Sequence, residues 1–227
     1  FNYQRTFGDH SIYSQLKWDY ENHDPNGINN TVNRQNFTWW SHYGYKNRYF
    51  VDLALVESAS NRLAPGTKWN FSPTLSAAWV LSKENFMEDA TWIDFLKLRA
   101  SAGIINVDNL PGDEVWAYYA QQYATSGGGY AFDSGWNSEF GRTYLGMMAT
   151  ANPTNEKAYK YNVGVDAKFF GGLDVTLDLW KEHRTDIWVT SDGKYSAVLG
   201  MDTPYENAGV VDSWGVELGL DYNKKIG

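Results

Sequence analysis

The sequence predicts an all-β fold, an antiparallel transmembrane β-barrel segment, and three observations lead to this prediction. Apolar and polar residues alternate with a period of two in many short stretches, which is typical of strands with two different faces. The connections between these stretches are short and long in turn. Aromatic residues make up 17% of the chain. Bands of Trp and Tyr at the strand ends, with short turns on one side and long loops on the other, are features of barrels that cross a membrane.

The alternating stretches define the expected strands. The pattern is longest at residues 159–169, 173–179 and 214–222, where Leu, Val and aromatic residues alternate with Asp, Lys, Asn, Thr and Gly. Similar shorter patterns occur earlier in the chain. We therefore expect about nine strands, at residues 1–7, 12–20, 37–45, 49–57, 75–81, 96–102, 159–169, 173–179 and 214–222.

The connections have two classes of length. Turn-forming residues supply short connections at 8–10, 46–47 and 171–172. A polar connection of medium length, 82–94, is expected to contain about one helical turn. The long connections are 21–35, 58–68, 106–157 and 182–211. This arrangement predicts that all long loops lie at one end of the sheet and the short turns at the other.

The composition of the two faces distinguishes a barrel from a soluble sandwich. The polar faces mix Gly164, Gly215 and Gly219 with Asp, Lys and Asn, which is typical of a crowded, hydrated lumen; Lys168 is expected there. The apolar faces, with Val163, Leu177 and Leu218, are expected to contact lipid. Aromatic residues form one band beside the short turns and another towards the long loops: Tyr43, Tyr45, Tyr49, Phe169 and Tyr222, and Trp18, Tyr20, Phe37 and Trp214. Aromatic pairs in a β-sandwich core are the alternative interpretation.

Composition excludes several other classes. No stretch approaches the ~20 consecutive apolar residues of a transmembrane helix. The chain has no Cys, which excludes disulfides and thiolate metal sites. A formal charge of −8 argues against a nucleic-acid partner.

Four ordered motifs resemble SusC/RagA-type TonB-dependent outer-membrane transporters. Residues 61–82, NRLAPGTKWNFSPTLSAAWVLS, resemble that family's R-F-A-P-G loop and its strand ending in A-G-W-x-I-S. Residues 94–103, DFLKLRASAG, resemble its next strand motif. EKAYKYNVGVD at 156–166 resembles W-E-K-x-x-x-Y-N-x-G-x-D. NAG at 207–209, followed by WGVEL at 214–218, resembles N-x-G…G-x-E-L. Departures occur at Asn155, where Trp is usual, and at Ala102, Ile104 and Ile105.

The resemblance implies a larger barrel and several partners. It implies a 22-stranded barrel, of which residues 1–227 would supply about nine strands, with the plug and N-terminal regions outside this chain. Phe1 stands in an expected strand with no leader peptide before it, in keeping with a segment. A SusD-like surface lipoprotein, the TonB complex acting through regions outside this chain, and outer-membrane lipid are the implied partners. The implied activity is import of an oligosaccharide or peptide.

A search for catalytic residues predicts no enzyme and no cofactor. The four His show no metal-ligand spacing, and neither a nucleophile elbow nor a phosphate-binding loop is present. Asp174 and Asp178 share a strand face about 13 Å apart, too far for the ~5–9.5 Å of a glycosidase pair. We expect them to be hydrated carboxylates bonded to neighbouring strands. Residues 24–30 have some character of a calcium loop but lack its closing acidic ligand.

The candidate binding residues lie in the long loop after Gly103. Aromatic rings separated by Gly and Ser suit stacking on sugars, holding peptide side chains or contacting a partner protein. Packing of the same rings over the barrel mouth is the structural alternative. The candidates are Trp116, Tyr118, Tyr119, Tyr123, Tyr130, Phe132 and Trp136.

Two other functional classes remain open at this stage. A secreted β-sandwich carbohydrate-binding module would also explain the aromatic residues. A glycan-degrading enzyme would require Asp174 or Asp178 for hydrolysis. We expect a transport protein rather than either of these.

Overall fold

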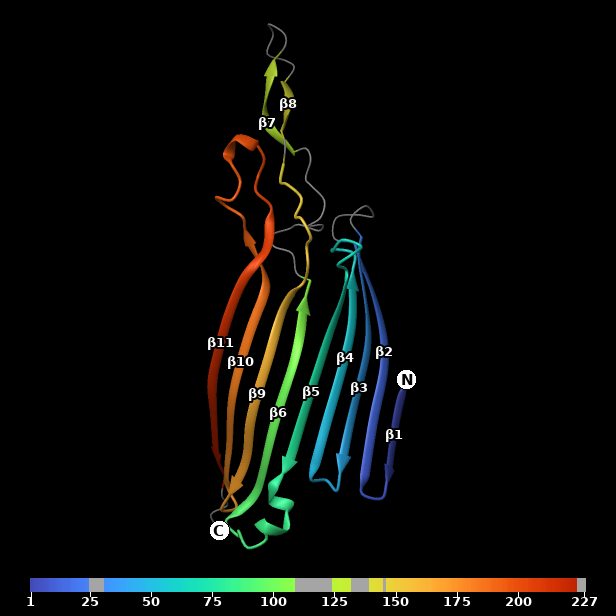
Figure 1. Cartoon of the computed structure of the whole chain (residues 1–227), viewed down its shortest axis with the longest axis vertical. Coiled ribbons are helices and arrows are strands. Elements are labelled where there is room, and N and C mark those ends of the chain that lie inside the picture. Colours follow the sequence, from blue (N-terminus) through green and yellow to red (C-terminus); the bar gives the residue numbers. More distant parts are fainter. Residues whose placement is uncertain (25–30, 109–123, 132–138, 145, 224–227) are drawn as a thin grey trace.

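The computed structural model describes residues 1–24, 31–108, 124–131, 139–144 and 146–223. A single nine-stranded antiparallel sheet dominates it, with the order β1-β2-β3-β4-β5-β6-β9-β10-β11 (Figure 1). Each strand therefore pairs with the next, except that β6 pairs with β9 and the β7–β8 hairpin stands apart as a second sheet. The short turns lie at the bottom of Figure 1 and the long connections at the top.

The strands vary from six to eighteen residues. The main sheet contains β1 (Asn2–Phe7), β2 (His10–His23), β3 (Val32–Tyr45), β4 (Tyr49–Ser60), β5 (Trp69–Val80), β6 (Ile93–Val107), β9 (Glu156–Phe169), β10 (Leu173–Thr190) and β11 (Tyr205–Tyr222). The separate hairpin contains β7 (Ala124–Ala131) and β8 (Glu139–Tyr144). Among the described residues, three short 3-10 segments lie outside the strands: η2 (Leu81–Lys83), η3 (Asn85–Met87) and η4 (Ala197–Leu199).

All nine expected strands are present, but their extent was underestimated. Residues 182–190 and 205–211, expected to be loop, belong to β10 and β11, and β7–β8 was not expected within the connection 106–157. The physical reason is that this part of β10 carries polar residues on both faces, such as Glu182, His183 and Arg184. Apolar–polar alternation therefore disappears there although the backbone pairing continues.

The short turns follow from backbone geometry. Lys46 and Asn47 have φ of 53° and 50°, and Phe170 and Gly171 have φ of 53° and 67°. Two consecutive positive φ values are the signature of the hairpin turns whose twist matches that of the strands. The medium connection forms η2 and η3, as expected of a polar segment with a helical turn.

The apolar face of the sheet is uncovered. Val163 and Leu218 are 57% and 63% exposed, and no described segment forms a second layer over them. Aromatic rings line this face in two rows: Trp18, Phe37 and Trp69 stack towards the long loops, and Tyr45, Tyr49 and Trp79 stack beside the short turns. Trp214 to Tyr222 spans nine residues, which matches the ~9–11 residues of a tilted strand that crosses a bilayer.

The most deeply buried residues lie above the sheet, where three connections meet. We call this region the loop base; it comprises residues 61–68, 146–155 and 191–204. Leu63, Pro153 and Pro204 are fully buried there. Thr67 donates to the carbonyl oxygen of Pro153 at 2.6 Å, and Thr150 donates to that of Tyr205 at 2.8 Å. Within the described ranges no helix is long and apolar enough to cross a membrane.

Candidate functional site: the polar face of the wall

The polar face is held together by side chains that alternate with the exposed apolar ones. Register places Arg99 of β6 opposite Gly164 of β9, which in turn is opposite Asp178 of β10. Lys97 is opposite Asp166 in the same way. Antiparallel pairing therefore brings together cations and carboxylates that lie more than sixty residues apart in the sequence.

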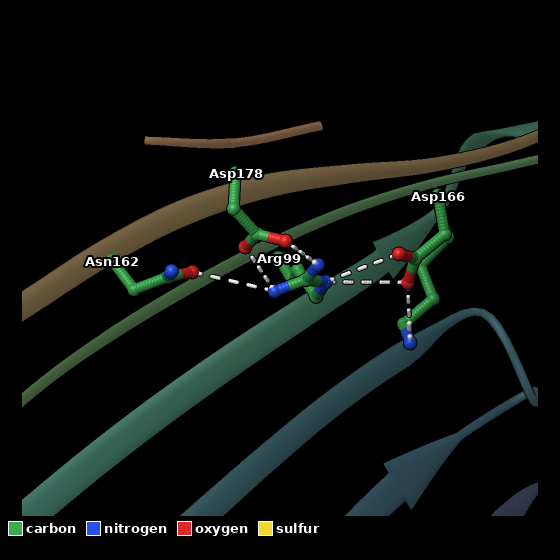
Figure 2. A network of polar contacts seen from close by, with 5 residues as sticks. Arg99, Asn162, Asp166 and Asp178 are labelled. Carbon is green, nitrogen blue, oxygen red and sulfur yellow. Dashed lines mark hydrogen bonds and ion pairs between the residues drawn. The ribbon is translucent and has the colours of Figure 1, made fainter. Parts of the chain in front are cut away.

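Arg99 is the centre of the largest network on this face (Figure 2). Its two terminal nitrogens donate to the two oxygens of Asp178, each at 2.6 Å, and its Nε donates to Asp166 at 3.2 Å. Nη1 also donates to Oδ1 of Asn162 at 3.3 Å, and Lys97 donates to Asp166 at 3.2 Å. Two cations and two carboxylates thus balance, and the paired, fork-shaped geometry is the strong form of this interaction.

Gly164 makes the network possible. A Cβ built on Gly164 would lie 2.6 Å from Cζ of Arg99 and 2.7 Å from Oδ1 of Asp178. The guanidinium therefore occupies the space that a side chain at position 164 would fill. Gly215 likewise leaves room for the ring of Trp180, because a Cβ built on Gly215 would lie 2.7 Å from that ring. A Cβ built on Gly219 would have no atom closer than 3.7 Å.

Several other carboxylates of the polar face are also paired. Lys168 donates to Asp174 at 3.2 Å, and Lys160 lies 3.4 Å from Glu182. His42 lies 2.6 Å from Asp52, to which Ser76 also donates at 3.3 Å. Asp174 and Asp178 are thus bonded to neighbouring strands, as expected from the sequence, and Lys168 lies on the polar face. No metal-binding group of His, Asp and Glu occurs among the residues described.

A separate cluster fixes the short-turn side of the sheet. Glu84, between η2 and η3, accepts hydrogen bonds from the Tyr49 hydroxyl at 2.6 Å, the Trp79 indole at 2.9 Å and Arg48 at 3.2 Å. These donors favour the charged carboxylate, so the pKa of Glu84 lies below its ordinary value, chiefly through Tyr49 and then through Trp79. The cluster ties the connection after β5 to the first residue of β4.

The predicted aromatic loop residues fall almost entirely beyond the described ranges. Six of them, Trp116, Tyr118, Tyr119, Tyr123, Phe132 and Trp136, lie outside the described residues. Tyr130 lies in β7, opposite Phe140 of β8. Their binding role stays a prediction. Most of the segment with some character of a calcium loop, residues 25–30, also lies outside the described ranges.

Two residues of structural importance were missed by sequence reasoning. Arg99 could have been noticed as a cation at a polar-face position of an alternating strand, but its carboxylate partners depend on strand register. Asn207, within the NAG motif, exchanges hydrogen bonds with the backbone of Thr154 at 3.0 Å and donates to the carbonyl oxygen of Asp186 at 2.7 Å. Asn207 therefore joins the segment before β9 to the β10–β11 hairpin.

Comparisons with known proteins agree with this geometry. The chain is 26% identical to the TonB-dependent receptor P39 of Formosa agariphila over 97% of its own length and 23% of that receptor. It is 24% identical to the TonB-dependent receptor SusC of Bacteroides thetaiotaomicron over 79% of its length and 17% of that protein. The chain thus spans less than a quarter of these curated relatives. No family profile matches the chain.

Solved structures show the same fold. The RagAB peptide transporter superposes with a TM-score of 0.79 over 96% of this chain and 26% of the matched chain, at 14% identity. The siderophore receptor PirA of Pseudomonas aeruginosa superposes with a TM-score of 0.57 over 93% of this chain and 36% of that receptor, at 13% identity. The nine-stranded sheet is thus the fold of a barrel wall.

A wall with one exposed apolar face, one charge-paired face and two aromatic rows defines an outer-membrane β-barrel protein. Within that class, the ordered motifs and the curated relatives make the chain similar to barrel segments of SusC-type TonB-dependent receptors.

Proposed function

We propose that this chain forms part of the wall of an importer that carries an oligosaccharide or a peptide across the outer membrane. The observation that carries the proposal is the two-sided sheet. Its apolar face is exposed between aromatic rows, as contact with lipid requires, and its polar face carries paired charges suited to a hydrated interior. The proposal is of a transporter and not of an enzyme, because Asp166, Asp174 and Asp178 of that face are each paired with a cation.

The proposal includes partners that lie outside the chain. A SusD-like surface lipoprotein would collect the nutrient on the long-loop side, and a plug and a TonB-contacting region of the same protein would gate the lumen. The likeness to SusC and to RagAB, whose structures are described as those of a peptide importer, supports this arrangement. The predicted aromatic loop would contact the nutrient or the lipoprotein.

Uptake by living cells tests the proposal. Cells that produce the full-length protein would receive either fluorescent malto-oligosaccharides or fluorescent peptides, in strains with and without TonB and with and without the neighbouring lipoprotein. We expect uptake of one nutrient class that requires TonB and falls without the lipoprotein. Absence of TonB-dependent uptake for both classes contradicts the proposal.

A soluble β-sandwich binding module is disfavoured by the uncovered apolar face. A sandwich needs a second layer over residues such as Val163 and Leu218, and the described residues contain none. Cell fractionation distinguishes the two: the full-length protein should require detergent for extraction from membranes, whereas a sandwich module stays soluble.

A further inference from the structure

A cavity of about 480 Å³ opens on the polar face at the long-loop ends of β3 to β6. It lies between the strands and the loop base, above the Arg99 network. Its volume falls in the range of small-ligand sites, and the proposed function gives it no particular role.

One part of the lining, which we call the floor, is aliphatic: Ala54 and Val56 of β4 and Ile105 of β6, beside the hydroxyl-bearing Thr74 of β5. Polar residues make up most of the remaining lining, among them Asn36, Ser58, Ser72 and Asn106. No aromatic residue is among the described residues that line the cavity. Sugars are bound largely by stacking on aromatic rings, which this cavity lacks, so the floor suits an aliphatic side chain better than a sugar ring.

Asn155 supplies a hydrogen-bond acceptor without a partner. Its side chain lines the cavity and is only 4% exposed, and its Oδ1 is buried with no hydrogen-bond partner in the described part of the chain. Buried polar atoms in native proteins are nearly always hydrogen-bonded. An unpartnered buried carbonyl oxygen beside a cavity indicates that a ligand N–H or O–H group completes the site.

The charged residues that line the cavity indicate which polar groups a ligand should carry. Arg34 is engaged by Asp108 through its Nε, at 3.2 Å, and through its Nη2. Lys68 also lines the cavity, and none of the ion pairs within the described ranges involves it. Besides Asn155, the lining therefore offers the Lys68 ammonium group and the hydrogen-bonding side chains of Asn36, Ser58 and Asn106.

We propose that this cavity binds one residue of an imported peptide. The aliphatic side chain of that residue lies on Ala54, Val56 and Ile105, a backbone N–H donates to Oδ1 of Asn155, and a backbone carbonyl or terminal carboxylate accepts from Lys68. The inference rests on the proposed function and assigns it a peptide substrate rather than a glycan.

The absence of cysteine from the chain allows a direct test. Ala54→Cys places one thiol in the cavity, and Ala78→Cys is the matched control on the polar face of β5, outside the cavity lining. Both are made in the full-length transporter in detergent, with any cysteine beyond these residues replaced. The measurement is the rate of modification by N-ethylmaleimide, alone and with the pentapeptide Gly-Gly-Leu-Gly-Gly or with maltopentaose.

We expect the pentapeptide, at ten times its dissociation constant, to slow modification of Ala54→Cys about tenfold and to leave Ala78→Cys unchanged. Maltopentaose should protect neither. In the Asn155→Leu background the peptide dissociation constant should rise about tenfold, whereas Asn155→Asp, which keeps an acceptor, should bind more tightly than Asn155→Leu. Reactivity of Ala54→Cys without peptide should be the same in all three backgrounds.

Three results overturn the proposal: protection of Ala54→Cys by maltopentaose, equal protection of both thiols or of neither, and an Ala54→Cys thiol that is unreactive without ligand. The last would show that another segment of the same protein fills the cavity. Uptake of the same pentapeptide by cells tests the import function separately from peptide binding in the cavity. If cells import it through TonB but Ala54→Cys is not protected, the cavity assignment fails and the import function stands.

Discussion

Two leucines show how differently the wall and the loop base of this molecule are stabilised. Leu218, on the apolar face of β11, is 63% exposed, whereas Leu63, in the connection between β4 and β5, is 1% exposed. The wall is one layer thick, so its apolar side chains are buried only when lipid covers them. The loop base lies in water and must build its own core from irregular segments. The largest fully buried side chains of the described residues, Leu63, Pro153 and Pro204, therefore lie in the connections and not in the sheet.

The largest effect is expected where the loop base is most tightly packed. Leu63→Ala leaves a cavity that little can fill, and should destabilise the loop base by about 2–5 kcal/mol. Hydrogen exchange of the Met148 and Thr154 amides in the full-length protein measures this, because both amides are hydrogen-bonded within or beside the loop base. Leu218→Ala is the control and should leave their exchange unchanged. Equal exchange in both variants contradicts the comparison.

Lipid contact should make the wall sensitive to charge on one face only. Val163→Lys places an ammonium group on the lipid side and should cost about 2–4 kcal/mol if it lies near the bilayer midplane. Lys168→Ala, on the polar face, removes a partly exposed pair with Asp174 and should change stability by less than about 1 kcal/mol. Urea unfolding of the transporter in lipid vesicles measures both. Similar losses in the free energy of unfolding for Val163→Lys and Lys168→Ala mean that the lipid face and the polar face are wrongly assigned.

The polar face should be sensitive to added volume at selected glycines. Gly164→Ala pushes a methyl group against Arg99 and Asp178 and should destabilise the wall by about 1–3 kcal/mol. Gly219→Ala meets no close neighbour and should be neutral or stabilising by about 0.5 kcal/mol, since Ala lowers the entropy of the unfolded chain. The same urea titration compares them. If Gly219→Ala lowers the free energy of unfolding more than Gly164→Ala does, the Arg99 network is not the reason for a glycine at position 164.

The smallest effect is expected at the short-turn side and depends on pH. Because the folded-state pKa of Glu84 is lowered, its contribution to stability is fully present above the unfolded pKa of about 4.3 and is lost as pH falls through the lower folded value. Glu84→Gln should therefore differ from the parent protein at pH 7 and approach it below pH 4. Urea midpoints measured between pH 7 and pH 2 give the comparison. A difference independent of pH would falsify this role for the carboxylate.

The wall could be predicted from sequence because each strand carries its own signal. Alternation at 173–179 and 214–222 identifies strands without any knowledge of their neighbours. Apolar–polar alternation ends beyond Leu179. Where both faces of β10 and β11 contact water, neither face has to be apolar. The outer parts of these strands were therefore missed although they are hydrogen-bonded continuations.

The sites were harder to predict because they depend on register and on the meeting of distant segments. Arg99 and Asp178 are 79 residues apart, and only the pairing of β6, β9 and β10 brings them together. Asn155 was noticed as a departure from the family pattern, but its burial beside a cavity arises from the packing of the loop base. Sequence alone indicates which face a side chain occupies and not which distant residue it meets.

The cancelled charges around Arg99 have a consequence for whatever moves along the wall. A lone arginine or aspartate would hold a passing solute by its opposite charge and release it slowly. Here Arg99 is already paired with Asp166 of the adjacent strand β9 and, across that strand, with Asp178 of β10, so this part of the surface offers hydration without a strong point of attachment. In the proposed importer, a surface of this kind would let polar molecules of either sign pass without being held.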